Sequence, residues 1–136
     1  EVEMYIATLP SSIAKDIVIT GYLSDADVPG IMREADLFLF PTLFEGFGLP
    51  VLEAFASGVP VVTSTTTSLP EVAGDAAILV NPTKVKDITE ASRRIITNRS
   101  YHKTLCEKGI TRCRQFSWDE AGRTTLETIL DTARYG

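Results

Sequence analysis

The sequence predicts an α/β protein with a parallel sheet of about four strands, helices covering that sheet, and a helical carboxyl-terminal segment. Two observations predict this class. Short apolar runs alternate with helical patterns as far as residue 82, and the pattern is helical from residue 83 onward. A complete doubly wound sheet usually has five or six strands. We therefore expect further strands upstream, in a longer protein.

The expected strands are short, rich in β-branched and aliphatic residues, and bounded by Gly, Pro or Asn. They lie at residues 17–22, 37–40, 60–63 and 78–80. Runs that are apolar throughout are typical of strands buried on both faces, as in a Rossmann-like sheet. In such sheets ligands bind beyond the carboxyl ends of the strands. The loops after Thr20, Phe40 and Thr63 are therefore the places to search for function.

The expected helices begin at residues that commonly cap helices. Ser24 or Asp25 precedes the first helix, Ser117 precedes the last, and Ser68 begins a short capped turn at 68–71. The spacing of apolar residues predicts helices at 24–34, 49–57, 84–97, 101–114 and 118–134.

Composition narrows the classes of function. The chain has 136 residues, 44% of them hydrophobic and 23% charged, which fits one globular domain spanning 1–136. With a net charge of −5, the chain lacks the excess of basic residues that is typical of nucleic-acid-binding proteins. No apolar run is long enough to span a membrane. Two cysteines cannot form a disulfide framework, so a cytoplasmic setting is expected.

The loop after the second predicted strand carries the chemistry. Gly46 and Gly48 let a ligand approach the backbone closely, and they lie beside the start of the helix predicted at 49–57. Free N–H groups and the helix dipole make such a position an anion site. Phosphate is the expected anion.

Two carboxylates flank this phosphate site. Glu53 lies about one turn into the helix, roughly 6 Å along its axis, where it can accept hydrogen bonds from both ribose hydroxyls of a nucleotide. Glu45 lies on the other side of the glycines, facing whatever the distal phosphate carries. The expected order along the site is therefore sugar, diphosphate, ribose.

Glu45 and Glu53 form a Glu-x7-Glu pattern inside the run Glu45-Gly-Phe-Gly-Leu-Pro-Val-Leu-Glu53. Together with the flanking residues 35–63 and the later Leu-Pro-Glu-Val at 69–72, this run resembles the donor-binding half of the family 4 (group 1) glycosyltransferases. The resemblance covers residues 17–118 and includes the strand and loop at 19–23. It implies a carboxyl-terminal nucleotide-sugar-binding domain of the two-domain GT-B fold.

The resemblance implies a retaining hexosyltransferase that moves a mannose- or glucose-like sugar from a UDP-, GDP- or ADP-sugar to an acceptor hydroxyl. The acceptor is a glycan or a lipid-linked glycan, bound through an amino-terminal domain absent from this chain; peripheral membrane association would also come through that domain. Glu45 matches the residue at the reacting sugar and Glu53 the residue on the ribose. Gly46, Phe47, Gly48 and Leu49 match the segment that meets sugar and phosphate, and Tyr22 and Leu23 flank the base. No metal or other cofactor is required by that scheme.

The chain departs from the family pattern in one respect. The Arg and Lys that neutralise the diphosphate in the family are not present, since Lys15 is the sole base before residue 17. We therefore expect this chain to be inactive alone. The alternatives are a non-catalytic nucleotide-binding module and a nucleotide-sugar epimerase of similar fold.

The remaining chemically versatile residues are expected to be structural. Cys106 and Cys113 lie seven residues apart on one predicted helix, about 10 Å along its axis and too far to bridge. His102 lies far from the glycine loop along the sequence, and Trp118 is expected to pack in the core at the start of the last helix.

Overall fold

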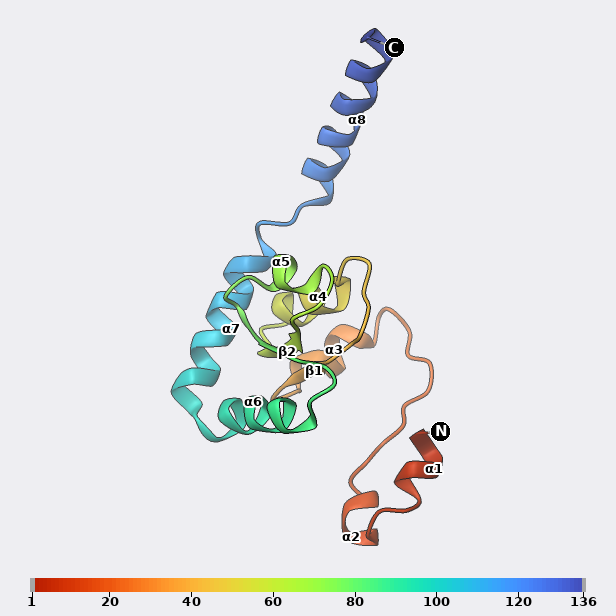
Figure 1. Ribbon diagram of the computed structural model, residues 1–136, viewed down its shortest axis with the longest axis vertical. Helices are drawn as coiled ribbons and strands as arrows, with labels where there is room; N and C mark the ends of the chain where they lie inside the picture. The colour runs from red at the N-terminus through yellow and green to blue at the C-terminus, as the bar shows by residue number, and fades with distance from the viewer. Residues whose placement is uncertain (1, 136) are drawn as a thin grey trace.

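A computed structural model describes residues 2–135 and contains a parallel sheet whose strands follow the order β1-β2-β3 (Figure 1). The strands are β1 (Phe38–Phe40), β2 (Val61–Ser64) and β3 (Ala77–Val80), and β2 lies between the other two. The register pairs Phe40 with Thr63 and Thr63 with Leu79. The predicted class, a parallel sheet covered by helices with a helical carboxyl-terminal segment, is confirmed.

Helices connect and cover these strands. In chain order they are α1 (Val2–Ile6), α2 (Ser11–Ala14), α3 (Val28–Arg33), α4 (Leu49–Ala56), α5 (Leu69–Ala73), α6 (Val85–Thr97), α7 (Arg99–Cys113) and α8 (Trp118–Tyr135). The predictions for α4, α6 and α8 agree with the structure to within one residue at each end. The short helices α1 and α2 were not predicted.

Alternation along β2 divides the core between two faces of the sheet. Val61 belongs to the cluster formed with α4 and α5, whereas Val62 belongs to the cluster formed with α6 and α7. Figure 1 shows α4 and α6 on opposite sides of the strands. Every residue of β2 is buried. The wholly apolar or neutral character of 60–64 is therefore explained by burial on both faces.

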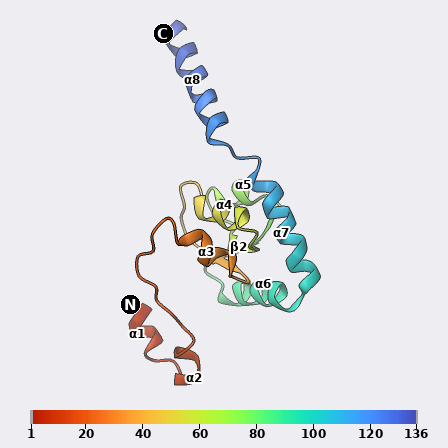
Figure 2. The ribbon, with the colours of Figure 1, turned by 180° about the vertical axis from the view of Figure 1, so that it is seen from behind.

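The strand predicted at 17–22 is not formed. Val18 is 78% exposed and Tyr22 is 92% exposed, and among the described residues no backbone hydrogen bond joins 18–22 to another segment. Figures 1 and 2 show this part of the chain running away from the sheet. A β-branched run becomes a strand only beside a neighbour whose backbone groups complete its ladder. Because this run has no such neighbour among the described residues, it forms no strand, and the sheet has three strands rather than four.

Two helix beginnings were also predicted wrongly. The helix expected from 24 begins at Val28, because residues 25–27 form a turn in which the Ser24 hydroxyl donates to the Asp27 carboxylate at 2.6 Å. The helix expected from 101 begins at Arg99, because the Asn98 side chain caps it by accepting from the Tyr101 N–H at 3.0 Å.

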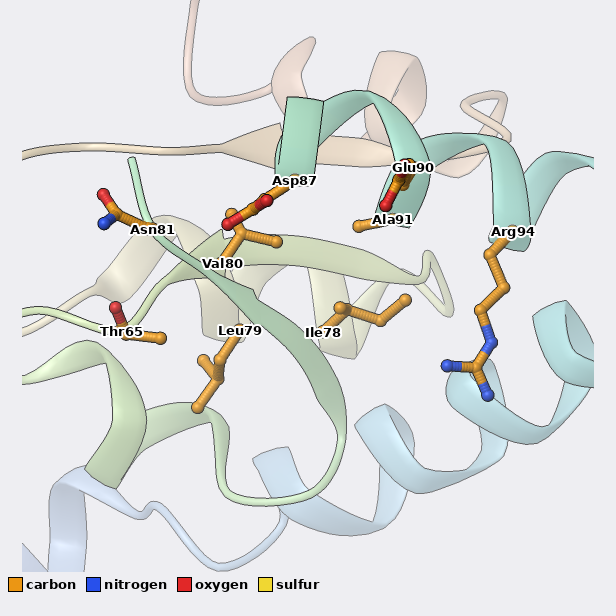
Figure 3. Close-up of a pocket in the computed structure, with 9 residues that line it drawn as sticks. All are labelled: Thr65, Ile78, Leu79, Val80, Asn81, Asp87, Glu90, Ala91 and Arg94. Carbon is orange, nitrogen blue, oxygen red and sulfur yellow. The ribbon is translucent and has the colours of Figure 1, made fainter. Parts of the chain in front are cut away.

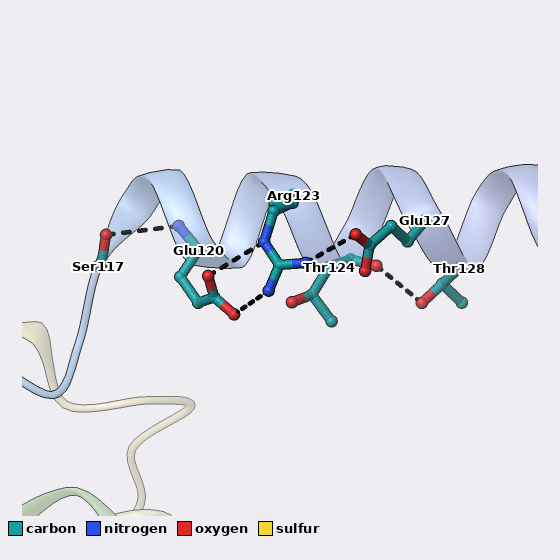
Figure 4. Close-up of polar contacts among 6 residues, drawn as sticks. All are labelled: Ser117, Glu120, Arg123, Thr124, Glu127 and Thr128. Carbon is teal, nitrogen blue, oxygen red and sulfur yellow. Dashed lines mark hydrogen bonds and ion pairs between the residues drawn. The ribbon is translucent and has the colours of Figure 1, made fainter.

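The last helix projects from the body of the molecule (Figures 1 and 2). The Ser117 hydroxyl accepts from the Glu120 N–H at 3.4 Å, as its capping role predicts, and Arg123 bridges Glu120 and Glu127 along one side (Figure 4). These two carboxylates raise the pKa of the Arg123 guanidinium. Trp118 is 80% exposed, so the prediction that it packs in the core is wrong. The helix turns away from the sheet at this residue, which removes the surface that would cover the indole.

Gly109 allows α7 to pack closely on α4. A Cβ at this position would lie 2.7 Å from Cδ1 and 3.2 Å from Cγ of Phe55, a fully buried ring that has no room to move. We therefore expect Gly109→Ala to destabilise the protein by about 1–2 kcal/mol, since overpacking outweighs the better helix propensity of alanine.

Gly122 on α8 is the matched control, because a Cβ there meets nothing within 4 Å. We expect Gly122→Ala to leave the stability of the body unchanged and to increase the helicity of α8. Urea denaturation of both variants measures the difference. Equal unfolding midpoints would contradict the close packing of α4 on α7.

Candidate functional site

The loop 41–48, which contains Gly46 and Gly48 and is named the glycine loop, leaves the carboxyl end of β1 and leads into α4, as the sequence predicts. Hydroxyl groups from β2 hold its beginning. The Thr63 hydroxyl donates to the Phe40 carbonyl at 2.9 Å, and the Ser64 hydroxyl donates to the Thr42 carbonyl at 2.6 Å. Because the strands are parallel, this loop and the loop 65–68 after β2 share one edge of the sheet.

Free amide groups mark the start of α4. Among the described residues, the N–H groups of Phe47, Gly48 and Leu49 donate to no protein acceptor. These groups lie at the positive end of the helix dipole, in the segment that the sequence predicts to bind phosphate. Phe47 and Leu49 are exposed whereas Gly48 is buried, so this segment offers unpaired donors near the surface at the start of α4.

The two glycines of the loop differ in their surroundings. Gly48 has a φ of 113°, and a Cβ there would lie 2.9 Å from Cδ2 of Leu69. Gly46 has no positive φ, and a Cβ there would meet nothing within 4 Å. Packing and backbone geometry thus require glycine at 48 but not at 46. The open space over Gly46 is available to a ligand.

Glu45 is half-buried within the loop. Its carboxylate Oε1 accepts from the Gly46 N–H at 3.1 Å, and its own N–H donates to the Thr67 hydroxyl oxygen at 3.3 Å. The carboxylate therefore rests on the amide next to the free N–H groups of residues 47–49. Its negative charge lies beside the candidate anion site, and the Gly46 N–H can be released if the carboxylate turns toward a ligand.

Glu53 lies on the exposed side of α4, one turn after the helix begins. It is not buried among its apolar neighbours, because Val51, Ala54 and Phe55 face the core while Glu53 and Ala56 face solvent. Glu53 lines two neighbouring hollows. One, of about 400 Å³, is formed with α3 and the turn before it; the other, of about 600 Å³, is mostly apolar and is formed with the start of α8.

The residues predicted to flank the base occupy two different environments. Tyr22 is exposed, and Leu23 is half-buried. The hollow of about 400 Å³ beside Glu53 is lined by Asp25 and Val28, which follow them closely in the chain. The chain thus brings the segment after Leu23 to the same hollow as Glu53.

The hydroxyl-bearing residues that hold the glycine loop were not predicted from the sequence. The signal was present in the run Thr-Ser-Thr-Thr-Thr-Ser at 63–68, which is unusual after a buried strand. Ser68 was predicted to cap α5, but its side chain makes no capping hydrogen bond. Its hydroxyl instead lies 2.7 Å from the Phe47 carbonyl and 3.1 Å from the Glu45 carbonyl.

A third hollow, of about 540 Å³, lies along β3 and α6 (Figure 3). Asp87, Glu90 and Arg94 project from α6 around it, and the Arg94 guanidinium also stacks on the Tyr101 ring at 4.1 Å. It contains none of the residues predicted for the donor site.

The two cysteines are free and half-buried on α7. Burial raises the pKa of the Cys106 thiol, which keeps it protonated at neutral pH. His102 lies 3.5 Å from the Cys106 sulfur and 3.1 Å from the Asp36 carbonyl, on the segment that precedes β1 rather than at the glycine loop. Within 2–135, no three side chains of His, Cys, Asp or Glu are grouped to hold a metal ion.

A parallel sheet with helices on both faces, and a loop with unpaired amides at the carboxyl ends of its strands, form the kind of α/β domain in which ligands commonly bind beyond the strand ends. The family model of the glycosyl transferases group 1 matches residues 2–98, so the chain belongs to this family. The family resemblance predicted from the run at 35–63, with its Glu-x7-Glu pattern, and from the later residues 69–72 is therefore confirmed.

Individual relatives agree with this assignment. The chain is 40% identical over 106 residues to O-antigen chain mannosyltransferase B of Escherichia coli, covering 78% of this chain and 28% of that protein. It is 32% identical over 114 residues to a GDP-mannose-dependent alpha-(1-6)-phosphatidylinositol dimannoside mannosyltransferase of Mycobacterium tuberculosis, covering 83% of this chain and 29% of that protein. The chain thus spans less than a third of the length of these relatives.

A solved structure shares the fold. Sucrose-phosphate synthase from Thermosynechococcus elongatus superposes with a TM-score of 0.84 at 23% identity, over 97% of this chain and 34% of that protein. This likeness confirms the expected GT-B type of domain. In the part of the chain that the structure describes, no helix is both long and apolar enough to cross a membrane.

Proposed function

We propose that this chain is the donor-binding part of a retaining glycosyltransferase that transfers a hexose from a nucleoside diphosphate sugar to an acceptor hydroxyl of a glycan. The observation that carries the proposal is the row of free amides at residues 47–49, bordered by Glu45 on one side and Glu53 on the other. A diphosphate on the amides puts the ribose toward Glu53 and the sugar toward Glu45. Mannose is the first candidate sugar, because the relatives above are mannosyltransferases and one name specifies GDP-mannose.

In this proposal the chemistry is electrostatic. Departure of the nucleoside diphosphate builds negative charge on the phosphate next to the sugar, and fixed N–H donors aimed there stabilise it. Glu45 orients the hydroxyls of the donor sugar and stabilises positive charge that develops at the anomeric carbon. The amides of residues 47–49 and the dipole of α4 hold the leaving diphosphate.

We further propose that this chain is a carboxyl-terminal portion of a larger enzyme and is inactive alone. The share of the mannosyltransferases that the chain matches, less than a third of their length, supports this. The acceptor site and the basic residues that neutralise the diphosphate then belong to the rest of the enzyme. Family membership favours a transferase over the epimerase and the non-catalytic module.

The experiment that tests this function uses the intact protein, meaning the full-length enzyme that contains this chain. It is a calorimetric titration with UDP, GDP and ADP, followed by transfer assays with the corresponding sugar conjugates. We expect one nucleotide to bind more tightly than the other two, and its hexose conjugate to support transfer with retention of the anomeric configuration. Failure of all three nucleotides to bind would refute the proposal.

We expect Glu53→Ala to weaken binding of the preferred nucleoside diphosphate. A charge-assisted pair to the ribose contributes about 1.5 kcal/mol at an exposed position, roughly a tenfold change in Kd. Glu90→Ala on α6 is the control, because it removes one exposed carboxylate at a hollow that contains no donor-site residue. Equal nucleotide affinity in the two variants would contradict the ribose role of Glu53.

A further inference from the structure

The side chain of Ser68 forms hydrogen bonds with the glycine loop and none with the helix that follows it, α5. Ser68 immediately precedes α5, with a φ of −77° and a ψ of −16°, and makes no side-chain capping hydrogen bond. Its hydroxyl lies 2.7 Å from the Phe47 carbonyl and 3.1 Å from the Glu45 carbonyl. One hydroxyl proton thus serves two carbonyls on either side of Gly46.

The neighbouring Thr67 reinforces this arrangement. It is the one non-glycine residue of the described chain with a positive φ, at 54°, and a β-branched residue rarely adopts such a conformation. Its hydroxyl oxygen accepts from the Glu45 N–H at 3.3 Å and its proton goes to the Thr66 carbonyl at 2.8 Å. The strained backbone therefore presents two consecutive hydroxyls to Glu45, that of Thr67 to its N–H and that of Ser68 to its carbonyl.

The helix that follows Ser68, α5, is itself fixed at both ends. Leu69 is fully buried against Gly48, and the Arg112 guanidinium of α7 donates to the Val72 carbonyl at 3.0 Å and to the Glu71 carbonyl. The short α5 is thus attached to the core and to α7. Because α5 is fixed in this way, the hydroxyl of Ser68 at its start restrains residues 45–47 of the glycine loop.

We propose that Ser68 is a positioning residue for sugar transfer, fixing the arc of residues 45–47 so that the Glu45 carboxylate and the adjoining free amides keep one arrangement. The inference rests on the proposed function, because it concerns the same donor site. Ser68 contacts neither sugar nor phosphate and acts through Glu45 and Phe47. Thr67 supports the same arc from the amide side.

The test compares Ser68→Ala with Ser68→Thr, which keeps the hydroxyl, in the intact protein. Ser92→Ala is the matched control, because Ser92 is also half-buried and donates to a backbone carbonyl, that of Ile88 at 2.8 Å, away from the loop. We expect Ser68→Ala to lower kcat roughly 10- to 100-fold, as misplacement of a reacting group does, with little change in nucleoside diphosphate Kd. Ser68→Thr should recover most of the lost turnover.

Two further measurements separate positioning from general stability. Hydrogen–deuterium exchange of the peptide covering residues 41–49 should be faster in Ser68→Ala and unchanged in Ser92→Ala. In a Glu45→Ala background, Ser68→Ala should cost much less turnover than in the unchanged protein, because a residue that acts through Glu45 cannot act without it.

The outcomes distinguish this inference from the function on which it rests. If the unchanged protein binds and transfers a nucleotide sugar but Ser68→Ala matches Ser92→Ala in kcat and exchange, Ser68 has no positioning role. A loss of unfolding stability much larger than that of Ser92→Ala, with no rescue of turnover by threonine, would equally refute it. Absence of nucleotide binding in the unchanged protein would refute the proposed function and this inference together.

Discussion

Replacing Glu45 by alanine in the intact protein is expected to reduce kcat by about 10²- to 10³-fold, the size of effect seen when a group that stabilises transition-state charge is removed. Glu45 borders the glycine loop on the side where the donor sugar would lie, and it is half-buried, so water replaces its carboxylate poorly. Its contribution should be greatest when charge develops at the anomeric carbon.

Nucleotide binding should respond differently to the same substitution. In the free protein the Glu45 carboxylate accepts from the Gly46 N–H, which keeps that donor from any ligand. Glu45→Ala releases this amide and removes a negative charge beside the anion site. We therefore expect binding of the nucleoside diphosphate to be unchanged or slightly tighter, despite the loss of turnover.

The measurement is a steady-state rate for transfer alongside a calorimetric Kd for the nucleoside diphosphate, with Glu71→Ala as the control. Glu71 is exposed on α5 and its side chain takes no part in the loop contacts described above. A variant that binds nucleotide more weakly but turns over normally would assign Glu45 to the diphosphate and not to the sugar.

The sequence predicted those parts of the fold in which local pattern and tertiary burial agree. The helix from Leu49 to Ala56 has Pro50 in its first turn and an apolar face, and its place after a buried strand follows from the same pattern. The two glycines before it also predicted a close approach of the backbone to a ligand. The sequence did not predict that the two glycines have different roles: only Gly48 has a positive φ and a Cβ position crowded by its neighbours.

Three of the errors, at 17–22, Trp118 and Ser68, share one physical cause, which is that each prediction depended on a partner that the local sequence does not specify. The run at 17–22 has strand composition, but a strand needs a neighbouring ladder and none of the described residues supplies it. Trp118 is a large aromatic residue of the kind that commonly fills a core, but α8 turns away from the sheet there and leaves it exposed. Ser68 stands where a cap is expected, yet its hydroxyl bonds to a loop twenty-one residues earlier.

Gly48→Ala is expected to destabilise the intact protein by about 2–5 kcal/mol, combining the strain of a left-handed backbone with the cost of overpacking. The backbone φ of 113° disfavours any L side chain, and the new Cβ would lie 2.9 Å from Cδ2 of Leu69, which is fully buried. Relief requires movement of either the loop or α5, and α5 is held by Arg112.

Gly46→Ala is the informative comparison, because a Cβ there meets nothing within 4 Å and the backbone has no positive φ. We expect its unfolding free energy to be unchanged or raised by about 0.4–1 kcal/mol through restriction of the unfolded chain. Binding of the nucleoside diphosphate sugar should nevertheless weaken, because the new methyl group enters the space that the ligand needs. Urea denaturation and calorimetric titration of the two variants therefore separate a glycine required by the fold from one required by the ligand. A Gly46→Ala protein that binds donor as well as the unchanged protein would mean that the open space over Gly46 is not part of the donor site.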